Sequence, residues 1–284
     1  MKLRDLKQEI IKTLSGTDGV LRPSWEASLI LATCLGVGRE KLVSMGEEDV
    51  SPHGALEMTA RRAKGEPLAY VLGTMDFLQW NFLVGPGCLI PRPETEVLAS
   101  LAAETLGPRG RFLDWGTGSG CIACSLAMMV DGSQGVAMDA SPGALKWAWR
   151  NVQRHRLSNR VLLVHGSSAH FISQDLTPFD LVVANPPYIP SEHMGELDGS
   201  VSRFEPHLAL NGGDGGIQVP VEWLRGAVRL LRAGGQVLME TAGDWQLSIL
   251  EALEIEGLSF VGSHQDQFGV RRVGRWKRVA DEIE

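Results

Sequence analysis

The residues with the clearest chemical potential form the stretch Asn185-Pro186-Pro187-Tyr188. It directly follows the apolar run 179–184, whose short, β-branched character is typical of a buried parallel strand. Asn185 has a side-chain carbonyl and Pro186 a free backbone carbonyl, which together can accept both hydrogens of a planar –NH₂ group. Tyr188 adds a flat face for stacking. The tetrad is therefore suited to presenting an amide or aromatic amine nitrogen to an electrophile, and the alternative is a loop that only ends the strand.

A glycine-rich loop supplies the second group of candidate residues. Asp114-Trp115-Gly116-Thr117-Gly118-Ser119-Gly120 directly follows an expected strand and opens a helix, and the next strand ends at Asp139. Glycines let the backbone approach a ligand closely, and an acid at that strand end can accept both hydroxyls of a ribose. Because the glycines run GxGxG and Asp114 suits a cationic sulfonium better than a pyrophosphate, S-adenosylmethionine (AdoMet) is favoured over NAD. A glycine turn that binds nothing is the other possibility.

The elements that position these loops alternate from Arg111 onward, which predicts a parallel sheet with helices on both faces. The expected strands lie near 111–115, 135–139, 161–165, 180–184, 235–240, 258–264 and 270–278. The expected helices lie near 120–130, 142–155, 218–232 and 244–256. The first ~70 residues have helical periodicity, and Met75–Ile90 changes to a β-hairpin pattern. We expect a helical domain at 1–72, a hairpin linker at 73–90 and an α/β catalytic domain at 91–284.

Composition narrows the class of protein. The 284 residues include 27 basic and 34 acidic groups, a net charge of −7, which gives no reason to expect stable binding to nucleic acid. The four cysteines make no disulfide framework and have no histidine cluster beside them, so we expect a cytoplasmic protein without a metal site. No apolar run reaches the ~18 residues of a membrane span. We also expect a monomer.

Three more segments, together with the glycine loop and the tetrad, resemble the HemK/PrmC family of peptide chain release factor glutamine (N5) methyltransferases. They are Gly65-Glu66-Pro67-Leu68-Ala69-Tyr70, Leu89-Ile90-Pro91-Arg92-Pro93-Glu94-Thr95-Glu96 and Arg203-Phe204-Glu205-Pro206. The tetrad is also found in DNA adenine methyltransferases, but its combination with the first two segments is specific. The likeness covers nearly the whole chain.

The resemblance implies a seven-stranded, Rossmann-like, AdoMet-dependent domain and an N-terminal helical domain that docks the substrate protein. The methyl acceptor in the family is the glutamine of the Gly-Gly-Gln tip of class I release factors. The residues expected to act on it are Asn185, Pro186 and Tyr188 as catalytic groups, with Pro187, Arg92 and Glu94 also binding substrate. The residues expected to bind AdoMet are Asp114, Gly116, Thr117, Gly118, Ser119, Gly120, Asp139, Ser167, Ser168 and Asn185.

The sequence departs from the family pattern at two places near the expected cofactor. The family usually has an acid and an aromatic residue near the adenine, where this chain has His165-Gly166-Ser167-Ser168, and Trp115 replaces a usual leucine. Ser167 can still accept a hydrogen from the adenine amine. Three alternatives remain: a glutamine methyltransferase acting on a ribosomal protein, a DNA adenine methyltransferase, which should carry a basic recognition region, and a non-catalytic AdoMet-binding module. The loop around Phe204 is expected to be either a substrate lid or an ordinary structured loop.

Overall fold

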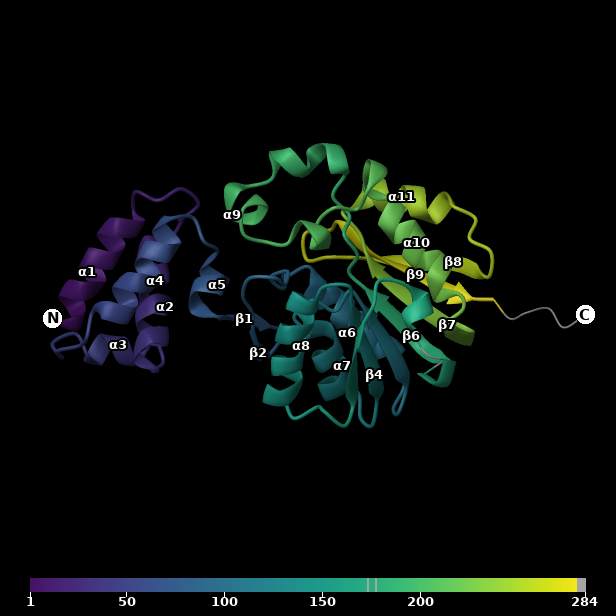
Figure 1. The fold of residues 1–284 in the computed structure, drawn as a ribbon, viewed down its shortest axis with the longest axis horizontal. Coiled ribbons are helices and arrows are strands. Elements are labelled where there is room, and N and C mark those ends of the chain that lie inside the picture. Colours follow the sequence, from purple (N-terminus) through teal and green to yellow (C-terminus); the bar gives the residue numbers. More distant parts are fainter. Residues whose placement is uncertain (173, 177, 280–284) are drawn as a thin grey trace, which may run out of the picture.

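The computed structural model describes residues 1–172, 174–176 and 178–279, so the expected end of the catalytic domain at 284 lies outside the described residues. The chain forms a small helical part at its N-terminus and a larger α/β part, joined through a short helix and a hairpin (Figure 1). None of the described helices is long and apolar enough to cross a membrane.

The N-terminal part is built from helices that enclose a core of their own. Its apolar positions recur at helical spacing, so one face of each long helix turns inward, as Leu6 and Ile10 of the first helix do. A buried ion pair joins Arg62 to Glu26 at 2.7 Å. The helices are α1 (Leu3–Leu14), α2 (Pro23–Leu35), α3 (Lys41–Ser44), α4 (His53–Ala63) and α5 (Leu68–Leu72).

A two-stranded antiparallel hairpin, β1 (Thr74–Phe77) and β2 (Trp80–Leu83), follows α5. Phe77 and Phe82 are buried in the core of the α/β part. The side chain of Asn151 accepts a hydrogen bond from the Leu83 backbone N–H at 2.7 Å and donates one to the Leu83 carbonyl at 2.8 Å. These contacts fix the hairpin to the α/β part.

The α/β part has a seven-stranded sheet in the order β5-β4-β3-β6-β7-β9-β8, which confirms the expected fold class. The pairs among β5, β4, β3, β6 and β7 are parallel, and β9 runs antiparallel to both of its neighbours. The strands are β3 (Arg111–Trp115), β4 (Gln134–Asp139), β5 (Val161–His165), β6 (Phe179–Ala184), β7 (Leu231–Glu240), β8 (Leu258–Gln265) and β9 (Arg271–Arg278).

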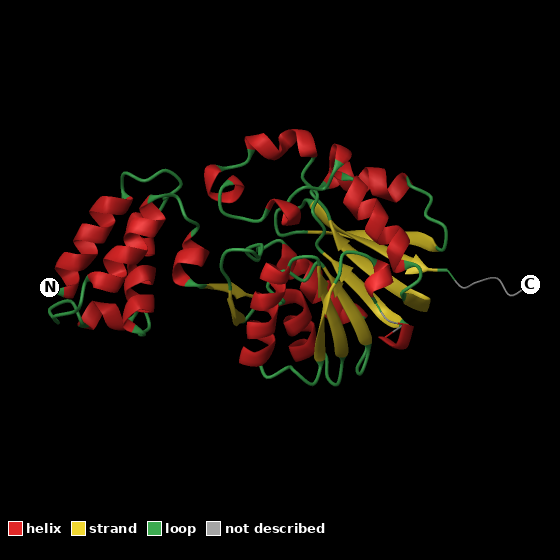
Figure 2. Ribbon diagram, viewed as in Figure 1, coloured by secondary structure: helices red, strands yellow, loops and turns green. Residues whose placement is uncertain are grey.

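Helices cover both faces of this sheet (Figure 2). One face packs on α6 (Thr95–Thr105), α7 (Cys121–Met129) and α8 (Pro142–Arg154), and the other on α10 (Gln218–Ala227) and α11 (Asp244–Ala252). Helix α10 ends before the expected residue 232, because Leu231 already begins β7. Short elements complete the chain: α9 (Gly199–Ser202), η1 (Ala169–Phe171), η2 (Gln174–Leu176), η3 (Ser191–Glu196), η4 (His207–Ala209) and η5 (Asp214–Gly216).

The strand order places the two candidate loops side by side. The chain builds the sheet outward from β3 to β5 and then returns to β6 on the other side of β3, which is a topological switch point. Trp115 pairs with Ala184, and Ala184 pairs with Met239. The residues that follow these positions, Gly116, Asn185 and Glu240, therefore lie at one level along the carboxyl edge of the sheet.

Candidate active site

A cavity of about 240 Å³ opens at this switch point. Its walls come from the loop after β3, the end of β4, the tetrad, the segment 87–89 and the loop that follows the tetrad. The hydroxyl of Tyr70 donates to the Cys88 carbonyl at 2.5 Å, so the Gly65–Tyr70 segment holds one wall in place. Regions that are far apart in the sequence thus meet around one space.

The glycine loop adopts a backbone that favours glycine. Gly116 and Gly118 have φ of 76° and 57°, in the left-handed region. A Cβ on Gly116 would lie 2.6 Å from the ring of Trp223, whereas a Cβ on Gly118 would meet nothing within 4 Å. The open space beside Gly118 allows a ligand to approach the backbone there.

Asp139 turns its carboxylate into the same cavity. One oxygen accepts from the Gly118 N–H and the other from the Ser141 N–H, each at 2.8 Å. Each oxygen retains a lone pair, so the carboxylate can still accept from the two hydroxyls of a ribose. Burial raises the pKa of Asp139, and the two N–H donors oppose that effect. The cavity and this fixed acceptor fit AdoMet.

Asp114 lies behind the loop, fully buried, and does not line the cavity. Its Oδ2 accepts from the Thr117 hydroxyl at 2.6 Å and the Ala123 N–H at 3.0 Å, which ties the loop to α7. Its Oδ1 has no hydrogen-bond partner among the described residues. Burial raises the pKa of Asp114 to about 7.

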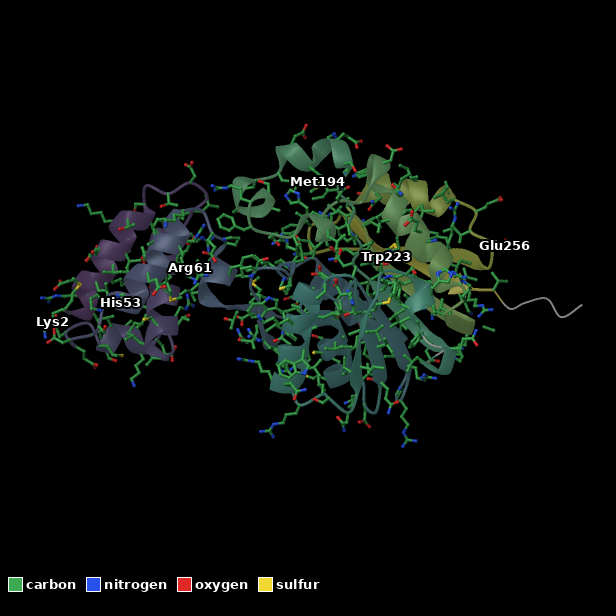
Figure 3. The ribbon with its side chains drawn as sticks, in the orientation of Figure 1. Lys2, His53, Arg61, Met194, Trp223 and Glu256 are labelled. Atoms are coloured by element: carbon green, nitrogen blue, oxygen red, sulfur yellow. The ribbon has the colours of Figure 1, made fainter. Side chains whose placement is uncertain are left out.

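Two tryptophans form the wall beneath the loop. The rings of Trp115 and Trp223 stack with centroids 5.2 Å apart and an interplanar angle of 16°. Both line the cavity together with Ser167, while Ser168 lines an adjoining cavity. Trp223 comes from α10 and lies in the α/β part, far from Lys2 and His53 of the N-terminal part (Figure 3). The aromatic surface near the expected adenine therefore comes from β3 and α10.

The tetrad contributes an oriented amide. The Asn185 Nδ2 donates to the Thr95 hydroxyl oxygen at 3.1 Å. Asn185 and Pro187 line the cavity. In the described part of the chain, the Asn185 Oδ1 and the Pro186 carbonyl have no hydrogen-bond donor. The Asn185 Oδ1 is thus an available acceptor on the cavity wall, whereas Pro186 is buried between two residues of that wall and does not itself line the cavity.

Tyr188 lies on the other side of the tetrad, in an open groove with Trp245 and Ile249. Burial raises the pKa of its phenol, and the nearby Glu240 carboxylate adds to that effect. The sequence-predicted cofactor residues Thr117, Ser119 and Gly120 lie outside the cavity lining, as Arg92 and Glu94 of the expected substrate site also do.

Arg92 has a partner in the loop after the tetrad. Its Nη2 donates to the Glu205 Oε1 at 2.5 Å, and the backbone N–H of Ile90 donates to the other oxygen at 3.0 Å. The Glu205 side chain is only 1% exposed. The ion pair therefore holds the loop around Phe204 against the segment that leads into α6.

Sequence reasoning gave no role to Thr95, Glu240 or Trp223. Thr95 lies inside the 89–96 segment, and only its contact with Asn185 reveals its position. Glu240 ends β7, next to β6, just as Asp139 ends β4 next to β3. The signal in the sequence that could have identified Glu240 is an acidic residue at the end of the strand that follows the tetrad in the chain.

Comparisons with known proteins identify the family of this chain. Residues 5–73 match the PrmC N-terminal domain and residues 93–197 the methyltransferase small domain. The release factor glutamine methyltransferase of Geobacter sulfurreducens is 35% identical over 258 residues, covering 90% of this chain and 89% of that protein. The enzyme of the same name from Moorella thermoacetica is 38% identical and covers 86% of this chain and 87% of its own.

A crystal structure of a methyltransferase from Pyrococcus furiosus aligns with a TM-score of 0.55 at 18% identity, over 79% of this chain and 99% of that one, and supports the fold. The two curated relatives match helical and α/β parts alike. The chain therefore belongs to the release factor glutamine methyltransferase family, a family of AdoMet-dependent protein-glutamine N-methyltransferases.

Proposed function

We propose that this protein transfers a methyl group from AdoMet to the side-chain amide nitrogen of the glutamine in the Gly-Gly-Gln motif of class I peptide chain release factors. The observation that carries the proposal is the Asn185 amide. Its Nδ2 is occupied by Thr95, and its Oδ1 remains available next to a cavity that also holds Asp139. This arrangement supports an amide-binding site next to a ribose-binding site.

The chemistry required of the protein is mainly positioning. Bound AdoMet would supply a sulfonium methyl group: the amide nitrogen would form the new N–C bond, the sulfur would keep the electrons of the broken C–S bond, and the nitrogen would release one proton to water. Asn185 Oδ1 and the Pro186 carbonyl accept the two amide hydrogens and orient the nitrogen toward the methyl carbon. They also favour the positive charge that builds on that nitrogen. Orientation of this kind contributes several kcal/mol to catalysis.

The remaining residues hold the cofactor in this proposal. The loop around Gly116 and Gly118 lies along its methionine part, Asp139 accepts from its ribose hydroxyls, and Ser167 accepts from its adenine amine. The stacked Trp115 and Trp223 support the purine. No group of three or more potential metal-ligating side chains occurs among the described residues, and the proposed transfer uses none.

The proposed partner is a release factor, and the proposed setting is the cytoplasm. The net charge of −7 supports a protein substrate over a stable nucleic-acid complex. We further propose that the enzyme acts as a monomer.

The test is a competition among acceptors. The protein and AdoMet are incubated with a class I release factor, a ribosomal protein fraction and an adenine-containing DNA duplex, and mass spectrometry identifies the methylated species. We expect one methyl group on the release factor. Methylation of a ribosomal protein alone would show that the substrate is that protein and not the release factor. Methylation of the duplex alone would show that the acceptor is not an amide.

A further inference from the structure

Thr95 is a buried hydroxyl between the ends of two neighbouring strands. It is the first residue of α6 and is 2% exposed. Its oxygen accepts a hydrogen bond from the Asn185 Nδ2 at 3.1 Å, across 90 positions of sequence. Asn185 follows β6 in the chain, so α6 supports the tetrad directly.

Glu240 ends β7 and is 1% exposed. Its carboxyl lies close enough to the Thr95 hydroxyl for that hydroxyl to lower its pKa, while its Oε2 has no hydrogen-bond partner among the described residues. An ionised carboxylate only accepts hydrogen bonds. The Thr95 proton is therefore directed to Glu240, which leaves the Thr95 oxygen to accept from Asn185.

We propose that Thr95 and Glu240 are positioning residues, which fix the Asn185 amide so that its Oδ1, and not its Nδ2, faces the acceptor glutamine. The inference rests on the proposed function, because it assigns the orientation needed to accept an amide hydrogen. If the Asn185 amide were rotated so that Nδ2 took the place of Oδ1, its N–H groups would point at the N–H groups of the glutamine amide, and no hydrogen bond could form. The Asn185–Thr95 hydrogen bond, with the Glu240 carboxylate near the Thr95 hydroxyl, favours the orientation in which Oδ1 faces the glutamine.

The direction of the chain depends on the charge of Glu240. A protonated Glu240 no longer attracts the Thr95 proton, which is then free to point to Asn185, so the preference for the Oδ1-facing orientation weakens. Burial raises the pKa of Glu240 to about 7, against the effects of Thr95 and Arg272. Arg92, Glu94 and the phenol of Tyr188 also face this carboxyl. Methyl transfer should therefore increase as Glu240 ionises.

The first test replaces the hydroxyl without changing the shape of the side chain. Thr95→Val should lower kcat/KM for the release factor about tenfold, the usual effect of losing one buried hydrogen bond, lower the Tm by a few degrees for the same reason, and leave the Kd for AdoMet unchanged. Thr95→Ser keeps the hydroxyl and should retain nearly full activity. Thr105→Val, at the other end of α6, is the matched control.

Two outcomes would overturn the inference: Thr95→Val with wild-type kcat/KM, or Thr95→Ser as impaired as Thr95→Val, which would indicate a packing role. A wild-type protein that methylates no release factor would refute the proposed function instead. The orientation is then judged without substrate, from the NMR signal of the Asn185 side-chain –NH₂ group, identified by its loss in Asn185→Asp. Its hydrogen exchange should accelerate about tenfold in Thr95→Val, and unchanged exchange would overturn the inference.

The second test follows pH at saturating AdoMet. The ratio of kcat/KM between wild type and Glu240→Gln should rise about tenfold from pH 6 to pH 8, because the amide introduced by the substitution does not titrate. Asp114 titrates in both proteins, so the ratio removes its contribution. A ratio that stays constant over this interval would overturn the role of Glu240.

Discussion

The two halves of the carboxyl edge of the sheet hold an acid at a strand end in opposite ways. In the half that we propose binds the cofactor, at the ends of β3 and β4, Asp139 accepts from two backbone N–H groups and faces the cavity. In the half that we propose binds the acceptor, at the ends of β6 and β7, Glu240 is shut off from solvent and lies near Thr95, whose hydroxyl accepts from Asn185. We call these the cofactor half and the acceptor half, and in our proposal the first acid contacts the ligand while the second orients the residue that does.

The two halves also differ in the sequence range of the contacts that assemble them. The cofactor half is assembled by local contacts, since Gly118 and Asp139 are 21 positions apart. The acceptor half depends on contacts of much longer range, as Asn185 with Thr95 and Arg92 with Glu205 show. Substitutions in the cofactor half should therefore change the affinity for AdoMet, and substitutions in the acceptor half should change the rate of methyl transfer.

The largest expected effect comes from Asn185→Ala. Removing the amide that orients the acceptor should lower kcat about 10²–10³-fold, comparable with the loss of one preorganised polar group in other active sites. The Kd for AdoMet, measured by calorimetry, should change little. A variant that methylates at nearly the wild-type rate would show that Asn185 does not orient the acceptor.

Arg92→Ala tests the long-range attachment of the acceptor half. It leaves the buried Glu205 carboxylate without its cation, so we expect the free energy of unfolding to fall by about 2 kcal/mol. Amide hydrogen exchange should increase in 199–209 and stay unchanged in 114–120. Arg232→Ala breaks an ion pair that is largely exposed, at 54% and 32% of its two side chains, and serves as a nearly neutral control. Equal effects of the two variants would contradict a structural role for the buried pair.

Asp139→Ala addresses the cofactor half. The loss of a carboxylate acceptor for the ribose should weaken AdoMet binding about tenfold, as measured by calorimetry with AdoMet or its demethylated product. The orientation of Asn185 should persist, so kcat at saturating AdoMet should fall much less than in Asn185→Ala. An unchanged Kd would show that Asp139 supports only the loop.

The smallest expected effect is on stability as a function of pH. Burial raises the pKa of both Asp114 and Glu240 to about 7, above their ordinary values of 3.8 and 4.5. Their contribution to stability is fully present below pH 4 and is lost as pH rises through about 7, because the folded state then holds two buried charges. Glu240→Gln should flatten the fall in the free energy of unfolding between pH 5 and pH 8. A steeper fall in this variant would show that ionised Glu240 stabilises the folded state, opposite to the expected effect.

The sequence predicted the parts of the site that depend on neighbours in the chain. The glycine loop and the tetrad each come at the end of a strand, and Asp139 is the last residue of another, so hydrophobic period and strand-end position were enough to identify them. The pairing of Thr95 with Asn185 was not predictable, since no spacing indicates a contact made by tertiary packing. The end of α10 was placed too late for a related reason: a mostly apolar stretch such as 227–231, interrupted only by Arg229, suits a helix and a strand equally well.

The proposed acceptor is the glutamine amide nitrogen of the Gly-Gly-Gln motif. The decisive measurement is tandem mass spectrometry of a release factor after incubation with the wild-type protein and AdoMet, beside a release factor in which that glutamine is replaced by glutamate. We expect one methyl group on the glutamine of the first substrate and none on the second. A methyl group of equal yield on both substrates would show that the glutamine is not the acceptor.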